Sequence, residues 1–136
     1  MGITIQIKTH SDVLHVLAEG EFTIESAETT FRQIVKAVVA GQNGKIFFDG
    51  RKVTGDPSFI ERFIYGEFTA NTVAHEVEAG RLSRPPKFAY VLSKPVLDEG
   101  RLGEMVATNR GLNVKAFDDM GRAIEWLDIP HSVLED

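Results

Sequence analysis

Hydrophobic and polar residues alternate with a period of two at the start of the chain. Ile3–Lys8 reads ITIQIK, and Asp12–Glu19 repeats the alternation after a short turn. This pattern predicts a β-hairpin. Three later runs are short and apolar and are flanked by turn-forming or charged residues, which predicts strands buried on both faces. These runs are Lys45–Phe48, Lys87–Leu92 and Asn113–Phe117.

Apolar residues recur at helical spacing in the segments between these strands. The first helix is predicted to follow an N-cap at Thr23 and to end at Gly41. The second is predicted to start at Asp56-Pro57, because an Asp side chain accepts from free amides and a proline there gives up no needed donor. It runs to about Gly80.

The last two predicted helices are less regular or shorter than the first two. A third is predicted within Ser93–Gly111, bent or frayed at its start by Pro95, Gly100 and Gly103. A fourth is predicted after a cap at Asp118, through GRAIEWL. Residues 129–136 are predicted to be a loose C-terminal tail.

The predicted order is β-β-α-β-α-β-α-β-α. Strands separated by helices are usually parallel neighbours joined by right-handed crossovers. The pattern therefore predicts an α/β sandwich, with a mostly parallel five-stranded sheet and an antiparallel edge strand. Ligand sites in such sheets lie beyond the carboxyl ends of the strands. Here that rim would include the segment Asp49–Ser58, where the Asp49-Gly50 pair predicts a turn.

Four segments, spread over nearly the whole chain, resemble the STAS family, which is the sulfate-transporter and anti-sigma-factor-antagonist domain. They are GEFT, KIFFDGRKVTGD, KFAYVLSKP and VKAFDDMGRAIEWL. The likeness is greatest to a bacterial branch of small proteins grouped with STAS domains and with the CRAL-TRIO lipid-binding fold. The resemblance implies a STAS-like fold and a regulatory role.

The resemblance also implies a position for a phosphorylated serine. In regulatory STAS proteins it follows an aspartate where the loop after the third strand enters the next helix. The corresponding residues here look like Asp56-Pro57-Ser58-Phe59, so proline stands where the serine would be. Ser58, one residue later, and Thr54, two residues before the aspartate, are the hydroxyls that could substitute.

Composition limits the classes of protein that fit. The 136 residues are enough for one domain, taken as residues 1–136, and 43% of them are hydrophobic. The net charge of -5 gives no general attraction to nucleic acid, and the absence of cysteine excludes disulfides and thiolate metal sites. No stretch free of charged residues is long enough to cross a bilayer. We expect a soluble, cytoplasmic protein.

Charged residues around the 49–58 segment make it a candidate contact site. Arg51 and Lys52 would attract an anion, whereas Asp56 and Pro57 oppose phosphate binding at the helix start by adding a carboxylate and removing an amide. A plain capped turn is the simpler interpretation. Asp49 ends a buried strand and either faces a ligand or bonds its own backbone.

No motif predicts a cofactor or a metal. His75 would need a second histidine four residues later to resemble a metalloprotease helix, and that residue is Ala79. Paired acids at helix ends read as caps and solvated faces, so no catalytic residue is predicted.

The second helix has a wide apolar and aromatic face. It is wider than one narrow buried stripe requires. The helix could simply pack between the sheet and its neighbour, form a homodimer contact, or line an apolar ligand groove. The residues concerned are Phe59, Phe63, Tyr65 and Phe68, with Arg62 at their rim.

The main hypothesis is a non-enzymatic regulatory or protein-interaction domain that binds a protein partner or forms a homo-oligomer. The alternative is a carrier or sensor of a small apolar or amphipathic ligand held between the second helix and the sheet. In that case Arg51 and Lys94, from neighbouring rim loops, would meet an acidic head group. An enzyme is a third, weaker hypothesis.

Overall fold

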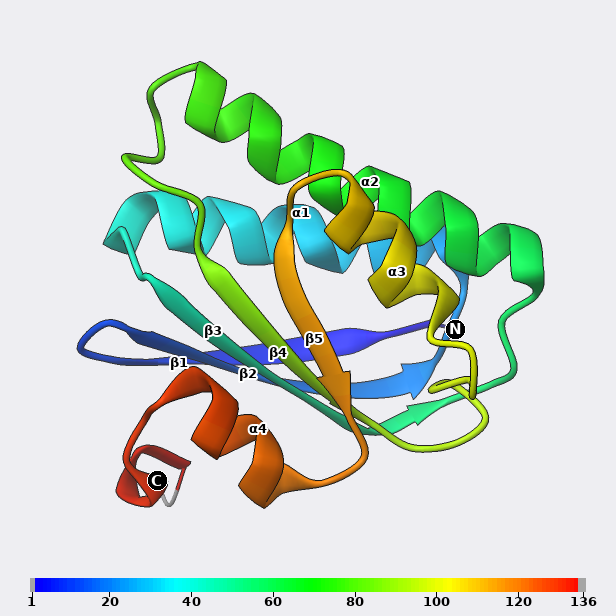
Figure 1. Cartoon of the computed structure of the whole chain (residues 1–136). Coiled ribbons are helices and arrows are strands. Elements are labelled where there is room, and N and C mark those ends of the chain that lie inside the picture. The colour runs from blue at the N-terminus through cyan, green and yellow to red at the C-terminus, as the bar shows by residue number, and fades with distance from the viewer. Residues whose placement is uncertain (1, 135–136) are drawn as a thin grey trace.

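A computed structural model describes residues 2–134 and shows a five-stranded sheet with helices on both faces (Figure 1). The elements, in chain order, are β1 (Thr4–His10), β2 (Val13–Glu21), α1 (Ile24–Gly41), β3 (Lys45–Thr54), α2 (Phe59–Glu78), β4 (Lys87–Leu92), α3 (Leu102–Asn109), β5 (Asn113–Phe117), α4 (Met120–Leu127) and a 3-10 turn (His131–Leu134). The predicted element order is confirmed.

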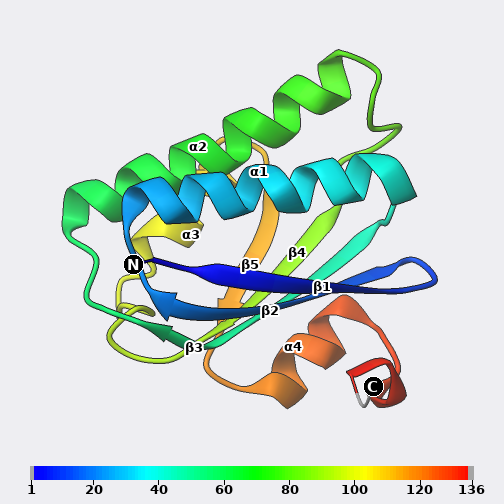
Figure 2. The same cartoon turned by 180° about the vertical axis from the view of Figure 1, so that it is seen from behind.

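The strands lie side by side in their order along the chain. β1 pairs antiparallel with β2 and forms one edge, and β2 to β5 are parallel, as predicted. Because every crossover moves one strand in the same direction, right-handed connections place α1, α2 and α3 on the same face. Figures 1 and 2 show these helices on one side of the sheet and α4 on the other.

Two hydrophobic cores result, one on each face of the sheet. The larger core lies under α1 and α2 and contains Phe31, which is fully buried, together with Phe48 and Phe88. The smaller lies under α4 and contains Phe47 and Leu127. Phe47 and Phe48 serve opposite cores because successive strand residues point to opposite faces. β3 is therefore buried on both sides, as the apolar run predicted.

The predicted turn at Asp49-Gly50 is wrong, because β3 continues through both residues to Thr54. The pairing with β2 shifts between Leu17 and Glu19, so β3 carries a β-bulge at this point. A Cβ atom on Gly50 would lie 2.7 Å from both Leu92 Cδ2 and Phe48 Cε1. The glycine therefore permits close packing inside a strand. It does not mark a chain reversal.

The predicted start of the second helix at Asp56 is also wrong. Ser58 is the N-cap of α2, and its side chain accepts a hydrogen bond from the Glu61 amide at 3.1 Å. The Glu61 carboxylate in turn accepts from the Ser58 amide at 2.8 Å, which completes a capping box. Asp56 remains in the preceding loop, where its carboxylate interacts with Arg62.

Ser58→Ala should lower the free energy of unfolding by about 1 kcal/mol, because it removes the acceptor for the Glu61 amide. Ser58→Asp keeps an acceptor at this position, so its free energy of unfolding should fall much less. Guanidinium denaturation followed by circular dichroism measures both. Equal losses in the two variants would contradict a capping role for the serine.

The third helix is shorter than predicted, since only Leu102–Asn109 is helical. Residues 93–101 form turns, and two of their carbonyl groups, those of Pro95 and Val96, accept hydrogen bonds from the Arg62 side chain. Arg101 has a φ of 49°, which stops a helix from passing through it.

The C-terminal region also differs from its prediction. Asp119, one residue after the predicted Asp118, is the N-cap of α4. Thr23 caps α1 as predicted. Within the expected loose tail, Ile129 is buried and Val133 and Leu134 pack against the smaller core. Residues 135 and 136 lie outside the described part of the chain.

Candidate functional site

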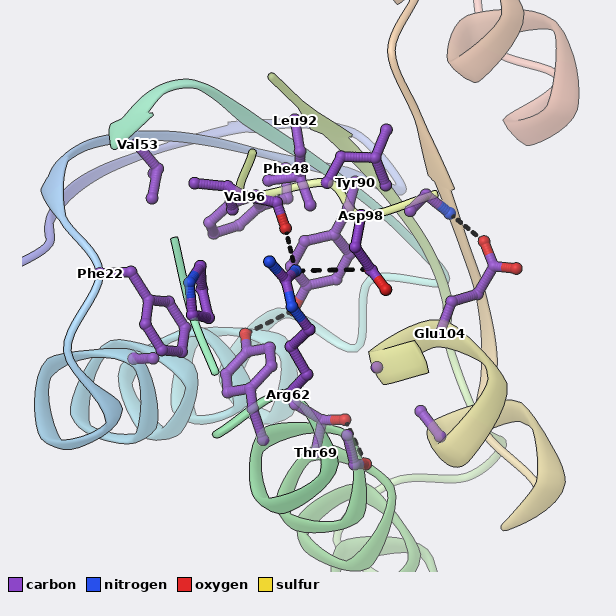
Figure 3. A pocket seen from close by; sticks show the side chains of 18 of the residues that line it. Phe22, Phe48, Val53, Arg62, Thr69, Tyr90, Leu92, Val96, Asp98 and Glu104 are labelled. Carbon is purple, nitrogen blue, oxygen red and sulfur yellow. Dashed lines mark hydrogen bonds and ion pairs between the residues drawn. The ribbon is translucent and has the colours of Figure 1, made fainter. Parts of the chain in front are cut away.

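A cavity of about 110 Å³ lies between α2, α3 and the sheet (Figure 3). Its lining includes Val53, Leu92 and Ala116, which lie at or near the carboxyl ends of β3, β4 and β5, the position predicted for a ligand site. Most of its wall is apolar. Side chains that form this wall include Phe22, Phe48, Val53, Pro57, Leu92, Val96, Leu97 and Val114.

Arg62 joins α2 to the two loops that border this cavity. Its guanidinium donates to the carbonyl oxygens of Pro95, at 2.8 Å, and of Val96. It also lies 3.4 Å from a carboxylate oxygen of Asp98 and 3.3 Å from one of Asp56. The Arg62 side chain is only 12% exposed. The fork-shaped donor set of arginine suits such a site, and we call this network the Arg62 clasp.

Two tyrosines form the polar part of the cavity wall. The hydroxyl of Tyr65, on α2, lies 3.0 Å from that of Tyr90, on β4. Burial raises the pKa of Tyr65 to about 12, although the hydrogen bond with Tyr90 opposes this shift. Burial and the neighbouring Tyr65 also raise the pKa of Tyr90 well above its usual value. Both phenols are therefore neutral at physiological pH.

The first turn of α3 covers the edge of the sheet beside the cavity. The Glu104 carboxylate accepts from the Ala116 amide at 2.6 Å, and Arg101 donates to the Ala116 carbonyl. Arg101 and Glu104 are themselves 3.7 Å apart. These two side chains form hydrogen bonds with the backbone amide and carbonyl of Ala116 on the edge strand β5. Their charged groups therefore already have partners.

A patch of large apolar side chains is exposed at the start of α2 and on the neighbouring α3. Phe59 and Ile60 are 69% and 62% exposed. The other members are Phe63, Ile64 and Met105. We call these five residues the apolar patch. The buried residues of α2, which face the core, are instead Thr69, Ala70 and Val73, together with Gly66.

The aromatic face predicted for the second helix is thus divided between different surroundings. Phe59 and Phe63 belong to the apolar patch, while Tyr65 and Arg62 line the cavity. Phe68 packs against Phe31, with 6.1 Å between their ring centroids. The wide apolar face predicted from the sequence serves a core, a cavity and an exposed surface.

The predicted rim residues do not gather into one site. Asp49 and Arg51 form a two-pronged ion pair with both nitrogen–oxygen distances at 2.9 Å. Lys52 and Lys94 are exposed, and neither lines the cavity. Arg51, bound to Asp49, does not line it either. Two other cationic side chains, those of Arg62 and Arg101, line the cavity.

The two candidate phosphoacceptors lie on either side of a short loop. Ser58 is the exposed N-cap of α2. Thr54 is the exposed last residue of β3, and its hydroxyl is 3.5 Å from the Gly20 carbonyl oxygen. Ser58 adjoins the apolar patch, because the patch begins at the next residue.

His15 is a buried histidine on the opposite face of the sheet. Its ring packs edge-on against Phe47 at 5.7 Å, and within residues 2–134 neither of its ring nitrogens has a hydrogen-bond partner. Burial lowers the pKa of His15 below 6.5, although the nearby Asp49 carboxylate acts in the opposite direction. Burial favours a raised pKa for Asp49, but hydrogen bonds from Arg51 outweigh it and lower the pKa.

Stability should therefore fall as the pH drops below about 6.5, because the unfolded chain then binds a proton on residue 15 that the folded chain does not. The slope for this one site is at most about 1.4 kcal/mol per pH unit. His15→Leu should show a weaker fall between about pH 7 and pH 5 in urea denaturation. Parallel curves for the two proteins would exclude His15 as the cause.

Several residues of the cavity could not be found from the sequence. Tyr90 lies within a predicted strand, Asp98 is one of the paired acids interpreted as solvated, and no pattern in the sequence singles out Glu104. The signals that pointed to this place were the predicted rim at the carboxyl ends of the strands and the residues Arg62 and Tyr65 on the second helix. A partial signal for Tyr90 is that β4 is otherwise wholly apolar from Phe88 to Leu92.

Comparison with models of protein families finds no match to this chain. Comparison with curated protein sequences finds none either. Within the described residues 2–134, no group of His, Cys, Asp and Glu side chains is placed to hold a metal ion. In the same range, no helix combines the length and apolarity needed to cross a bilayer.

Solved structures do match, and they show that the chain has the STAS-like fold of anti-sigma-factor antagonists. The crystal structure of an anti-sigma factor antagonist from Mycobacterium paratuberculosis has a TM-score of 0.59 at 19% identity, over 93% of this chain and 95% of that one. The NMR structure of the protein TM1081 has a TM-score of 0.50 at 21% identity, over 90% and 86%.

A third similar structure is that of a Shewanella loihica protein described as having a SpoIIAA-like fold. Its TM-score is 0.48 at 19% identity, over 93% of this chain and 94% of that one. The fold predicted from the sequence resemblance is confirmed by the Mycobacterium structure.

Proposed function

We propose that the chain is a non-enzymatic, cytoplasmic protein-interaction domain that associates through the apolar patch. The observation that supports this proposal is the exposure of five large apolar side chains at one end of α2 and on α3. Large apolar side chains that are exposed together often mark a protein-interaction site. The fold agrees with a regulatory role, since a structure with the same fold is named as an anti-sigma factor antagonist.

A second copy of the chain is the partner that fits the patch best. All five patch residues are uncharged, and the Arg110 guanidinium that lies 5.3 Å from the centre of the Phe63 ring is paired with Glu67. Two copies carry the same net charge of -5 and repel one another elsewhere on their surfaces. An uncharged apolar contact is therefore the part of the surface best suited to self-association. Such a contact is isologous if the same patch serves both subunits.

Sedimentation velocity tests this proposal. The weight-average sedimentation coefficient of the wild type should rise with concentration, from low micromolar to the highest soluble concentration. Ile60→Glu places a charge in the patch and should hold the protein as a monomer. Ala74→Glu, on an exposed position of the same helix outside the patch, should behave as wild type. A wild type that is monomeric at every concentration would overturn the proposal.

We further propose Ser58, in preference to Thr54, as a hydroxyl whose phosphorylation controls the patch. Ser58 is exposed and directly precedes Phe59 and Ile60. A phosphate would add roughly two negative charges there and repel Glu61 from the capping box. Ser58→Asp should weaken self-association relative to Ser58→Ala. Intact-mass analysis of the native protein that finds no phosphate in any growth condition would remove this switch.

A further inference from the structure

The cavity beside the Arg62 clasp is large enough for a small organic molecule. Its volume is about 110 Å³, and an engineered apolar cavity of roughly 150 Å³ in another protein binds benzene. A molecule of about benzene's size is therefore a suitable test of the cavity. The cavity is distinct from the apolar patch, because the five patch residues do not line it.

The charged groups in the cavity wall already have partners. Arg62 binds two carbonyls and two carboxylates, while Arg101 and Glu104 bind the backbone of Ala116. The hydroxyls of Thr30 and Thr69 donate to carbonyl oxygens within their own helices. An anionic ligand would have to displace Asp56 or Asp98 from Arg62 and would approach the Glu104 carboxylate. The wall therefore disfavours anions.

The tyrosine pair is different, because its hydrogen bonding is incomplete. Two hydroxyl groups carry two protons, and the single contact between Tyr65 and Tyr90 uses one of them. Within residues 2–134 the second proton has no protein acceptor. The raised pKa values of both phenols keep that proton in place. Since both residues line the cavity, one hydrogen-bond donor is available to a molecule inside it.

We propose that this cavity binds a small neutral molecule with an apolar body and one acceptor oxygen, such as a ketone, ester or ether. The apolar body contacts side chains such as Phe22, Val53 and Leu92, and the oxygen accepts from the Tyr65–Tyr90 pair. The Arg62 clasp holds the segment that contains Val96 and Leu97 against the ligand. The protein would then sense or carry this molecule in addition to associating through its patch.

Three probes of about the same size as benzene separate the possibilities. Cyclopentanone has the acceptor oxygen, methylenecyclopentane has the same shape without it, and butanoate carries a negative charge. Titration of the full chain, followed by amide resonances in ¹⁵N–¹H spectra, gives a dissociation constant for each. Cyclopentanone should cause saturable shifts at cavity residues such as Val53 and Ala107, and butanoate should bind more weakly.

Tyrosine variants test the donor itself. Tyr65→Phe or Tyr90→Phe alone leaves one hydroxyl whose proton is free, so either single variant should still prefer the ketone. The double variant leaves no hydroxyl. Its preference for cyclopentanone over methylenecyclopentane should fall about fivefold to tenfold relative to wild type, the loss expected for one hydrogen bond. Ile60→Glu should bind all three probes as wild type does, which separates this proposal from the proposed function.

A measurement on the wild type guards against a double variant that fails to fold. The ¹³C resonance of the bound cyclopentanone carbonyl should lie downfield of its position in cyclohexane, because an accepted hydrogen bond shifts it that way relative to an apolar solvent. The proposal is overturned if no probe gives saturable shifts at the cavity, which would mean that it holds water only. Tighter binding of butanoate, an unchanged ketone preference in the double variant, or a bound carbonyl resonance at its cyclohexane position would overturn it equally.

Discussion

Phe31→Ala should lower the free energy of unfolding by about 3–5 kcal/mol, the usual loss for deleting a fully buried phenylalanine side chain. Phe31 belongs to α1, and its ring is completely buried. It packs near the rings of Tyr65, Phe68 and Phe88, with centroid distances of 6.2, 6.1 and 5.7 Å. The substitution therefore leaves a void between α1, α2 and the sheet. Denaturation in guanidinium, followed by circular dichroism, measures the loss.

Phe31→Leu is the matched control, because it keeps most of the apolar volume. Its loss should be clearly smaller, and the difference between the variants reports the cavity left by alanine. A loss below about 1 kcal/mol for Phe31→Ala would show that the surrounding helices collapse into the space. That result would contradict a rigid contact between Phe31 and Tyr65.

Arg62→Met should have the second largest effect, lowering the free energy of unfolding by about 2–3 kcal/mol. It leaves the Pro95 and Val96 carbonyls without their donor and Asp98 without its cation. Asp56 contributes little to the loss, since its side chain is 76% exposed and remains hydrated. Guanidinium denaturation gives the global loss. Hydrogen exchange at the Leu97 amide reports opening of the 93–101 segment.

Two companion variants identify the source of this loss. Arg62→Lys keeps the charge but lacks the fork of donors, so it should recover only part of the stability. Asp98→Asn in the Arg62→Met background removes the unpaired charge and should also recover part of it. If Arg62→Lys matches wild type in both stability and Leu97 exchange, the clasp is a simple charge effect and the carbonyl contacts are unimportant.

Local sequence signals were reliable where the local chain decides the structure. Alternation in Ile3–Lys8 predicted the edge strand, and the hydroxyl of Thr23 predicted the start of α1. The same kind of signal was misleading at Asp49-Gly50, because a Cβ atom on the glycine would crowd Leu92 on the neighbouring strand as well as Phe48 on its own. No local pattern records such a contact.

The start of α2 shows the same limit at a finer scale. Asp56 and Ser58 are both good N-caps, and the sequence rules favoured the aspartate because proline follows it. In the folded chain, the Asp56 carboxylate interacts with Arg62, while Ser58 and Glu61 form the capping box. A capping box was visible in the sequence as Ser-Phe-Ile-Glu, so the correct cap could have been found.

The sequence by itself determined the class of fold, since alternating strands and helices with short connections allow few arrangements. It also indicated that α2 has more apolar surface than one contact needs. The tertiary structure alone decided how that surface is used. Arg62, Tyr65 and Ile60 lie within two turns of one helix, yet they meet the 93–101 segment, Tyr90 and solvent respectively. Pro95, which binds Arg62, and Tyr90, which binds Tyr65, are 33 and 25 residues away in the chain, and only the packing of β4 and the 93–101 segment against α2 brings them together.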